Sequence, residues 1–208
     1  MLPALLLTMA LAYLLGSVPT GYLVGRARGL DLRVLGSGNI GATNALRVLG
    51  KPAGTLVLLG DALKGWVACS MVPALAWRWA GPASGTAPVW LGVAGGLAAV
   101  VGHNYTCWLR FKGGKGIATS GGVLLGLMPQ ALLTVLGVFG LVLLLTRIVS
   151  LGSLSAATAL PFAVWFWHRD PVLIALGGSL AALAFVRHSA NLRRLLNGTE
   201  PRLGQPTP

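Results

Sequence analysis

Residues 102–119, GHNYTCWLRFKGGKGIAT, lie between two long apolar segments, so their backbone is expected where hydrocarbon meets water. Glycine and lysine alternate just before the second apolar run begins at Ile117. Glycines let successive N–H groups converge on an anion, and a helix that starts there adds the positive end of its dipole. The candidate anion ligands are Lys112, Gly113, Gly114, Lys115 and Gly116. The stretch therefore predicts an anion-binding loop at a membrane surface.

Two other interpretations of this loop were weighed against its residues. A nucleotide P-loop is excluded because Lys115 is followed by Gly116, where that motif requires Ser or Thr. A basic turn that only anchors two membrane helices stays open as the alternative, since such turns are common on the cytoplasmic side.

The composition is that of an integral membrane protein. Of 208 residues, 55% are hydrophobic and only 10% are charged, against about 25% charged in soluble domains, and the mean hydropathy is +0.76. The net charge of +12 indicates anionic lipid headgroups and anionic substrates as partners. Nucleic acid is not expected, because aromatic-rich binding motifs are missing. The scattered carboxylates and histidines predict no metal, and no cofactor is predicted.

Seven apolar segments are predicted to cross the membrane, each needing about 20 residues or fewer where the bilayer thins. The predicted spans are residues 2–24, 54–80, 88–101, 117–128, 129–146, 149–167 and 172–186. The run 117–146 is divided because Pro129 removes a helix donor and clashes with the preceding turn.

The distribution of basic residues predicts the orientation. Thirteen of the sixteen Lys and Arg residues fall at 26–51, 102–116, 147 and 187–202. Seven spans place all four groups in the cytoplasm, whereas six leave Arg147 outside. The predicted fold is an all-α integral membrane protein with the N-terminus outside, the C-terminus cytoplasmic, and short interfacial helices and loops on the cytoplasmic face. Residues 1–203 are predicted to form a single multi-pass domain, and 204–208 a disordered end.

The first cytoplasmic loop contains LGSGNIGATNALR at residues 35–47. Its small polar side chains beside a cation suit an anionic substrate, with residues 44–49 as a short helix closed by Gly50. The candidates are Ser37, Asn39, Thr43, Asn44 and Arg47. The alternative is an interfacial helix that Asn or Thr merely caps.

Other polar residues allow a structural and a functional interpretation. Asp61 and Lys64 are spaced i,i+3 inside a predicted span and are interpreted as a structural ion pair. Ser150 and Ser153 either cap a helix or donate a hydroxyl to a substrate oxygen.

The C-terminal stretch RHSANLRRLLNGTE, residues 187–200, places two polar residues one helical turn apart. His188 and Asn191 would share a face at the cytoplasmic end of the last span. Glu200 is interpreted as a structural partner for the basic tail.

Three stretches together resemble the motifs of the bacterial glycerol-3-phosphate acyltransferase family PlsY, which takes its acyl group from acyl phosphate. They are SGNIGATNALR at 37–47, the loop at 102–119, and RHSANLRRLLNGTE at 187–200. The resemblance covers nearly the whole chain in order and spacing. It implies seven membrane helices, a bacterial inner-membrane location, and an active site facing the cytoplasm that makes lysophosphatidic acid from glycerol 3-phosphate and acyl phosphate.

The resemblance also implies roles for individual residues. Ser37 and Arg47 fall on a functional serine and arginine, and His188 and Asn191 on functional positions of the third motif. Residues 112–116 fall on the glycerol-phosphate loop, and Ser153 corresponds by spacing to a site serine. Ser37, Arg47, Lys115, His188 and Asn191 are thus expected to be catalytic, and the remaining candidates to bind substrate. The enzyme that makes acyl phosphate is a plausible partner.

The residues themselves favour direct acyl transfer. No Gly-x-Ser-x-Gly elbow is present, and Trp108 stands where an H-x-x-x-x-D box would need aspartate after His103.

Two other functions are possible for a basic membrane protein of this kind. A transporter or flippase for a small anionic phosphate ester would need a matching site on the outer turns, which offer none. A scaffold for an acidic partner would not explain glycines and small polar residues interleaved with basic ones.

Overall fold

The computed structural model describes residues 1–82 and 85–204, and this part of the chain is helical without strands. Of the predicted disordered end, residues 205–208 lie outside the described part. The α-helices, in chain order, are α1 (Leu2–Ser17), α2 (Thr20–Arg26), α3 (Ala42–Leu49), α4 (Lys51–Ser70), α5 (Val72–Ala80), α6 (Val89–Asn104), α7 (Ile117–Leu127), α8 (Pro129–Thr146), α9 (Val149–Trp167), α10 (Pro171–Arg187) and α11 (Ser189–Leu196). A 3-10 turn, η1 (Cys107–Leu109), precedes Lys112–Gly116, the glycine loop.

The chain forms two compact units. The first contains Met1–Pro19 and Leu59–Pro129, and the second contains Thr20–Leu58 and the chain from Gln130 onward. The division falls inside α4, between Leu58 and Leu59. The prediction of a single membrane domain is not tested by these contacts and stays a prediction.

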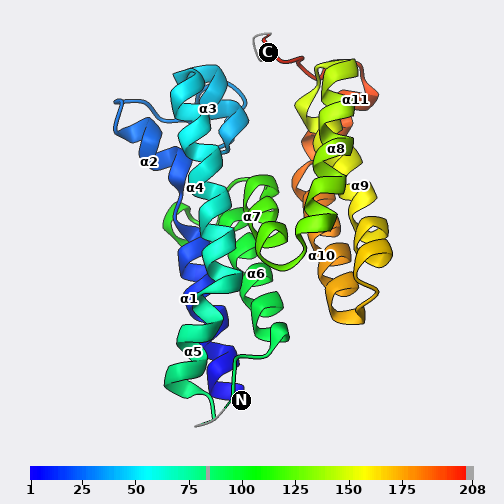
Figure 1. Ribbon diagram of the computed structural model, residues 1–208. Helices are drawn as coiled ribbons and strands as arrows, with labels where there is room; N and C mark the ends of the chain where they lie inside the picture. Colours follow the sequence, from blue (N-terminus) through cyan, green and yellow to red (C-terminus); the bar gives the residue numbers. More distant parts are fainter. Residues whose placement is uncertain (83–84, 205–208) are drawn as a thin grey trace. The chain divides into compact units, whose positions relative to one another are not determined.

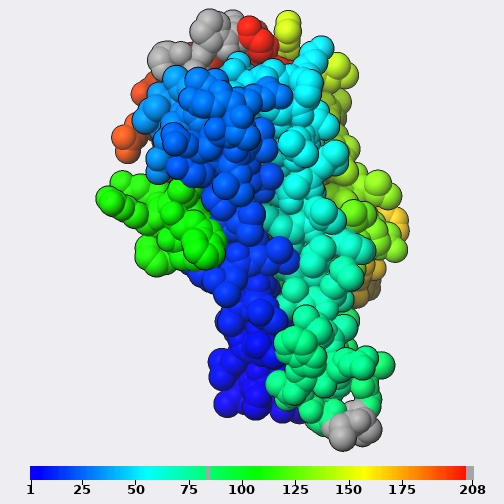
Figure 2. Space-filling model, turned by 90° about the vertical axis from the view of Figure 1, so that its left-hand side faces the viewer, coloured from blue at the N-terminus to red at the C-terminus, as the bar shows by residue number. Residues whose placement is uncertain are grey.

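Helices in the first unit pack through small residues. Figure 1 shows α1, α6 and α7 as neighbours, and α5 packs along α1, as the adjoining surfaces at one end of Figure 2 also show. A Cβ atom at Gly95 would lie against the carbonyl oxygen of Ala68, and one at Gly16 against that of Ala99. Lipid chains give no hydrophobic drive for helices to associate, so close backbone approach and van der Waals contact must hold them together.

In the second unit, α9 and α10 pack as an antiparallel pair, and α2 packs against α3. Leu32, Ala45 and Val57 form a small buried cluster beneath the loop that precedes α3. Asp170 caps α10, accepting hydrogen bonds from the Val172 and Leu173 amides at 2.8 and 3.1 Å. The first loop and the C-terminal tail both belong to this unit.

The predicted breaks in the helices are confirmed. Residues 117–146 divide at Met128, where φ is −147°, and α8 begins at Pro129. Gly50 ends α3 with a φ of 86°. The short helix begins at Ala42, two residues earlier than predicted, and its N-cap is Gly41 without a side-chain cap. The interpretation of Asn44 or Thr43 as its N-cap is therefore wrong.

Four segments are long and apolar enough to cross a membrane: Leu2–Arg26, Lys51–Ala80, Pro129–Thr146 and Val149–Trp167. The bent pair α10 and α11, which meet at 63°, makes a fifth candidate, and α7 is apolar but shorter. Leu133, Leu144 and Leu145 of α8 are each at least 70% exposed, as expected of side chains that face lipid. Seven crossings and their orientation remain a prediction.

Neighbouring glycines on α7 provide a test of the close packing. A Cβ at Gly122 would overlap the carbonyl oxygen of Ala62, whereas a Cβ at Gly121 would have nothing within 4 Å. We expect Gly122→Ala to cost about 1–3 kcal/mol of unfolding free energy through overpacking. Gly121→Ala should leave stability unchanged or raise it by up to about 1 kcal/mol. Thermal unfolding in detergent measures both, and equal unfolding temperatures for the two variants would contradict this packing.

Candidate active site

The loop before α3 is folded around the side chain of Asn44, which is 2% exposed. Its amide nitrogen donates to the carbonyl oxygens of Leu32, Leu35 and Asn39 at 3.2, 3.0 and 2.8 Å. Its oxygen accepts the amide hydrogen of Ser37 at 2.9 Å. Asn44 was predicted to bind substrate. In the structure its side-chain amide forms hydrogen bonds with the backbone of the loop that carries Ser37 and Asn39.

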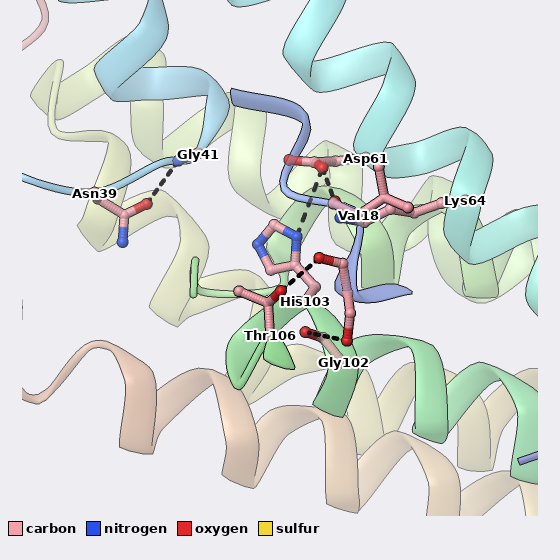
Figure 3. A network of polar contacts seen from close by, with 9 residues as sticks. Val18, Asn39, Gly41, Asp61, Lys64, Gly102, His103 and Thr106 are labelled. Atoms are coloured by element: carbon pink, nitrogen blue, oxygen red, sulfur yellow. Dashed lines mark hydrogen bonds and ion pairs between the residues drawn. The ribbon is translucent and has the colours of Figure 1, made fainter. Parts of the chain in front are cut away.

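Glycines and a second asparagine complete the turn of this loop. Gly36 and Gly38 have φ values of 59° and 69°, in the left-handed region that glycine adopts without strain. Asn39 accepts the Gly41 amide hydrogen at 2.8 Å (Figure 3), an Asx turn that leads into α3. The loop leaves Ser37 exposed and Thr43 half-buried.

Arg47 lies on α3 and is half-buried, and its Nε is buried without a hydrogen-bond partner among the described residues. Burial lowers the pKa of its guanidinium, an effect that the charge of Glu200 opposes and that of Arg194 reinforces. A buried cationic donor without a partner is costly, so an anion that paired with Arg47 would be stabilised there.

Glu200 joins three parts of the second unit. Its carboxylate accepts hydrogen bonds from Ser150 Oγ and Asn191 Nδ2, both at 2.6 Å, and from Arg194 Nε at 2.7 Å. Burial alone would raise the pKa of Glu200, but the bonds from Ser150, Asn191 and Arg194 outweigh it and lower that pKa. The structural role predicted for Glu200 agrees with these contacts.

The serines at the start of α9 are not caps. Ile148 occupies the N-cap position, and α9 has no side-chain cap. Ser150 donates to Glu200, and Ser153 donates to the carbonyl oxygen of Val149 at 3.0 Å. The capping interpretation of both serines is therefore wrong. Ser153, predicted as a substrate ligand, has its hydroxyl hydrogen engaged within its own helix.

His188 and Asn191 lie on consecutive turns at the junction of α10 and α11, and both are buried. His188 Nδ1 lies 2.8 Å from the carbonyl oxygen of Ala184. A carbonyl can only accept, so Nδ1 carries the hydrogen, and in the neutral ring Nε2 carries the lone pair. The bond from Asn191 Nδ2 to Glu200 likewise fixes which way its amide faces.

The glycine loop belongs to the first unit and packs onto the end of α6. The amide of Gly113 donates to the Asn104 carbonyl at 3.1 Å, and that of Gly114 to the His103 carbonyl at 3.0 Å. Predicted to face an anion, these two N–H groups instead bind backbone. Gly113 and Gly114 are required because a Cβ at either position would meet His103 or Asn104.

A helix, α7, starts at the end of the loop. Gly116, with a φ of 81°, is the N-cap of α7. The first N–H groups of α7, from Ile117 to Thr119, have no partner within the helix. Lys112 is exposed and Lys115 is half-buried beside them. The convergence of the helix dipole and the lysine charges on an anion stays a prediction.

This geometry can be set beside known proteins. The family model described as glycerol-3-phosphate acyltransferase matches residues 6–198. The chain belongs to this family. A relative from Geobacter sulfurreducens, named glycerol-3-phosphate acyltransferase, is 48% identical over 202 residues, which cover 97% of this chain and 98% of that protein.

Two crystal structures of PlsY, described as an integral membrane glycerol 3-phosphate acyltransferase, are also similar. Its glycerol 3-phosphate form is 37% identical with a TM-score of 0.85, and the match covers 96% of each chain. Its lysophosphatidic acid form is 36% identical with a TM-score of 0.82, and the match covers 96% of this chain and 95% of that one. The resemblance to the PlsY family seen in the sequence is confirmed.

Reasoning from the sequence missed the residues that hold the loops in shape. Thr106 donates to the Ser17 carbonyl at 2.6 Å, and Ser17 Oγ donates to the Gly102 carbonyl at 3.3 Å (Figure 3). The predicted pairing of Asp61 with Lys64 is confirmed at 2.9 Å, but its third neighbour, His103, was not foreseen. The available clue was a histidine in the same stretch, residues 102–119, as the glycines.

Removing the Asn44 amide should disorganise the first loop. Asn44→Ala leaves up to four buried backbone groups without partners, and we expect a loss of about 1–3 kcal/mol in unfolding free energy. Faster hydrogen exchange at the Ser37 amide would localise the effect. Asn197→Ala, at an exposed position after α11, is the matched control and should change neither measurement. Unchanged exchange at Ser37 in Asn44→Ala would contradict the assigned role.

The lowered pKa of Glu200 predicts a pH-dependent contribution to stability. The charged form contributes fully above the ordinary glutamate pKa of about 4.3, and its contribution is lost as pH falls through the folded-state pKa. Glu200→Gln should therefore unfold several degrees below the parent at pH 7, and the gap should narrow below about pH 4. Asp31→Asn, which removes an exposed ion pair with Arg33, is the control and should have little effect at pH 7. A gap for Glu200→Gln that does not vary with pH would refute the charge-based explanation.

Proposed function

We propose that this chain transfers a fatty acyl group from acyl phosphate to the 1-hydroxyl of sn-glycerol 3-phosphate, giving lysophosphatidic acid and phosphate. The observation that carries the proposal is the family match together with two similar PlsY structures, described as glycerol 3-phosphate and lysophosphatidic acid forms. These are the acceptor and the product of the proposed reaction. The net charge of +12 suits two phosphate-bearing substrates.

The proposed chemistry is direct transfer. The 1-hydroxyl oxygen attacks the acyl carbonyl carbon and forms the ester bond, while the bond from that carbon to the phosphate oxygen breaks. Phosphate leaves with the electron pair, so no strong acid is needed. Positioning of the two substrates and stabilisation of the developing charge would then provide most of the acceleration.

The proposed ligands lie on the first loop, on α3 and at the start of α7. Arg47 is assigned to substrate phosphate because its buried Nε has no partner among the described residues. Lys112, Lys115 and the first turn of α7 are assigned to phosphate at the glycine loop. Ser37, Asn39 and Thr43 provide polar contacts on the first loop. Asn44, Gly113 and Gly114 serve by holding these loops in shape.

Two groups can accept the hydroxyl proton. His188 is a candidate because its Nδ1 contact with Ala184 leaves the lone pair on Nε2 in the neutral ring. The phosphate of the acyl donor is the other, since it gains charge as it leaves. Asn191, held by Glu200, and Ser153 are proposed to orient substrate oxygens near this step.

The proposed setting is the bacterial inner membrane, with seven spans and the active site on the cytoplasmic side. The seven predicted spans each correspond to a helix or a pair of helices in the described chain. Anionic lipid would bind the basic loops, and the enzyme that makes acyl phosphate is the proposed partner.

The test uses purified protein with labelled glycerol 3-phosphate and compares acyl phosphate with acyl-CoA as donors. We expect lysophosphatidic acid from acyl phosphate alone. Arg47→Ala should lower kcat/KM by about 100- to 1,000-fold, the usual cost of losing a charge-stabilising donor. The matched control is Arg169→Ala, at the turn between α9 and α10, which should keep the parent activity.

Each other result corrects a separate part of the proposal. Product from acyl-CoA would overturn the proposed donor, and a trapped acyl-Ser37 would overturn direct transfer. Absence of product from both donors, with the protein folded, would overturn the acyltransferase function itself.

A further inference from the structure

Three ionisable side chains meet inside the first unit. Asp61 and Lys64 lie one turn apart on α4, and His103 lies near the end of α6. Their side chains are 2%, 5% and 5% exposed. Buried charge in a membrane helix is expensive and is normally retained for a purpose.

One carboxylate oxygen is shared by the other two members. Asp61 Oδ1 lies 2.9 Å from Lys64 Nζ and 3.6 Å from His103 Nδ1 (Figure 3). Lys64 Nζ also donates to the carbonyl oxygen of Val18 at 2.8 Å, just beyond the end of α1. Asp61 and Lys64 already neutralise each other, so charge balance alone does not require the histidine.

The histidine connects this cluster to the glycine loop. The His103 carbonyl accepts the Gly114 amide hydrogen, and its ring lies so close to Gly114 that an added Cβ would overlap Nε2. Rotation of the ring would therefore displace the loop. Asp61 Oδ1 lies 3.6 Å from Nδ1 of the same ring, so this buried carboxylate occupies space into which the ring would otherwise turn.

The adjoining residue, Asn104, holds the loop from the same helix end. Its carbonyl accepts the Gly113 amide hydrogen, and its fully buried side chain lies where a Cβ at Gly116 would be. The position of Gly116, and with it the start of α7, thus depends on how the last turn of α6 is held.

We propose that Asp61, Lys64 and His103 are positioning residues that hold the glycine loop in the conformation that receives the phosphate of glycerol 3-phosphate. The inference rests on the proposed function for the identity of that ligand. The restraint on the loop itself is a property of the protein without substrate, so it can be measured separately.

Two double variants that differ by one polar group test the proposal. Asp61→Leu/Lys64→Met replaces the ion pair with apolar side chains of similar size, a change that buried pairs often tolerate without loss of stability. Asp61→Asn/Lys64→Met is equally uncharged but keeps an oxygen facing His103. The control is Asp170→Asn, which exchanges one good N-cap for another at the start of α10.

The expected result separates loop position from stability. Asp61→Leu/Lys64→Met should raise KM for glycerol 3-phosphate by about tenfold or more, because small misplacements of a binding group are costly. Its KM for the acyl donor and its unfolding temperature should stay near the parent values. Asp61→Asn/Lys64→Met and Asp170→Asn should keep the parent KM. Without substrate, hydrogen exchange at the Gly113 and Gly114 amides should be faster only in the leucine variant.

Other outcomes overturn the inference. Parent-like KM and exchange in the leucine variant would show that the cluster does not position the loop, as would equal defects in both double variants. If the leucine variant does not fold, His103→Gln carries the same test, and unaltered loop exchange in it would overturn the proposal. Failure of the proposed function is distinguishable, because the parent would then make no product while the exchange measurements still report on the loop.

Discussion

Helices that associate in lipid must touch at the backbone, and the first unit depends on this constraint. Glycine or alanine occupies the contacts between α1, α4, α6 and α7, so each helix fixes the height and rotation of the next. The glycine loop continues this pattern beyond the helices, because Gly113 and Gly114 lie against the end of α6 as closely as one helix lies against another. The conformation of the glycine loop in this unit consequently depends on the same close packing that holds the helices together.

The second unit solves a comparable problem with hydrogen bonds. Asn44 forms hydrogen bonds with several backbone groups of the first loop. Glu200, in the tail, accepts hydrogen bonds from side chains of α9 and α11. In both cases one polar side chain satisfies several hydrogen-bonding groups. Candidate ligands such as Ser37 and Asn191 are therefore held by neighbours that need not contact substrate.

The sequence predicted the helices well because hydropathy and proline act locally. The break at Pro129 and the end of α3 at Gly50 could be read from single residues. The roles of Asn44, Ser150 and Gly113 could not, because each depends on a partner brought close only by folding. Glycine in particular was assigned to anion binding, whereas at Gly113 and Gly114 it permits contact with α6. The contacts of several motif residues thus depend on partners that the sequence alone does not identify.

The shortness of α7 has a consequence for the bilayer itself. Its eleven residues rise about 16 Å, roughly half the thickness of the hydrocarbon core. The loop end carries lysines, whereas Met128 at the other end is fully buried and donates its amide hydrogen to the Leu124 carbonyl oxygen at 2.7 Å. The chain therefore leaves α7 at a residue that is enclosed by protein. This end of the short helix is thus covered by protein, so its backbone groups do not need to meet lipid.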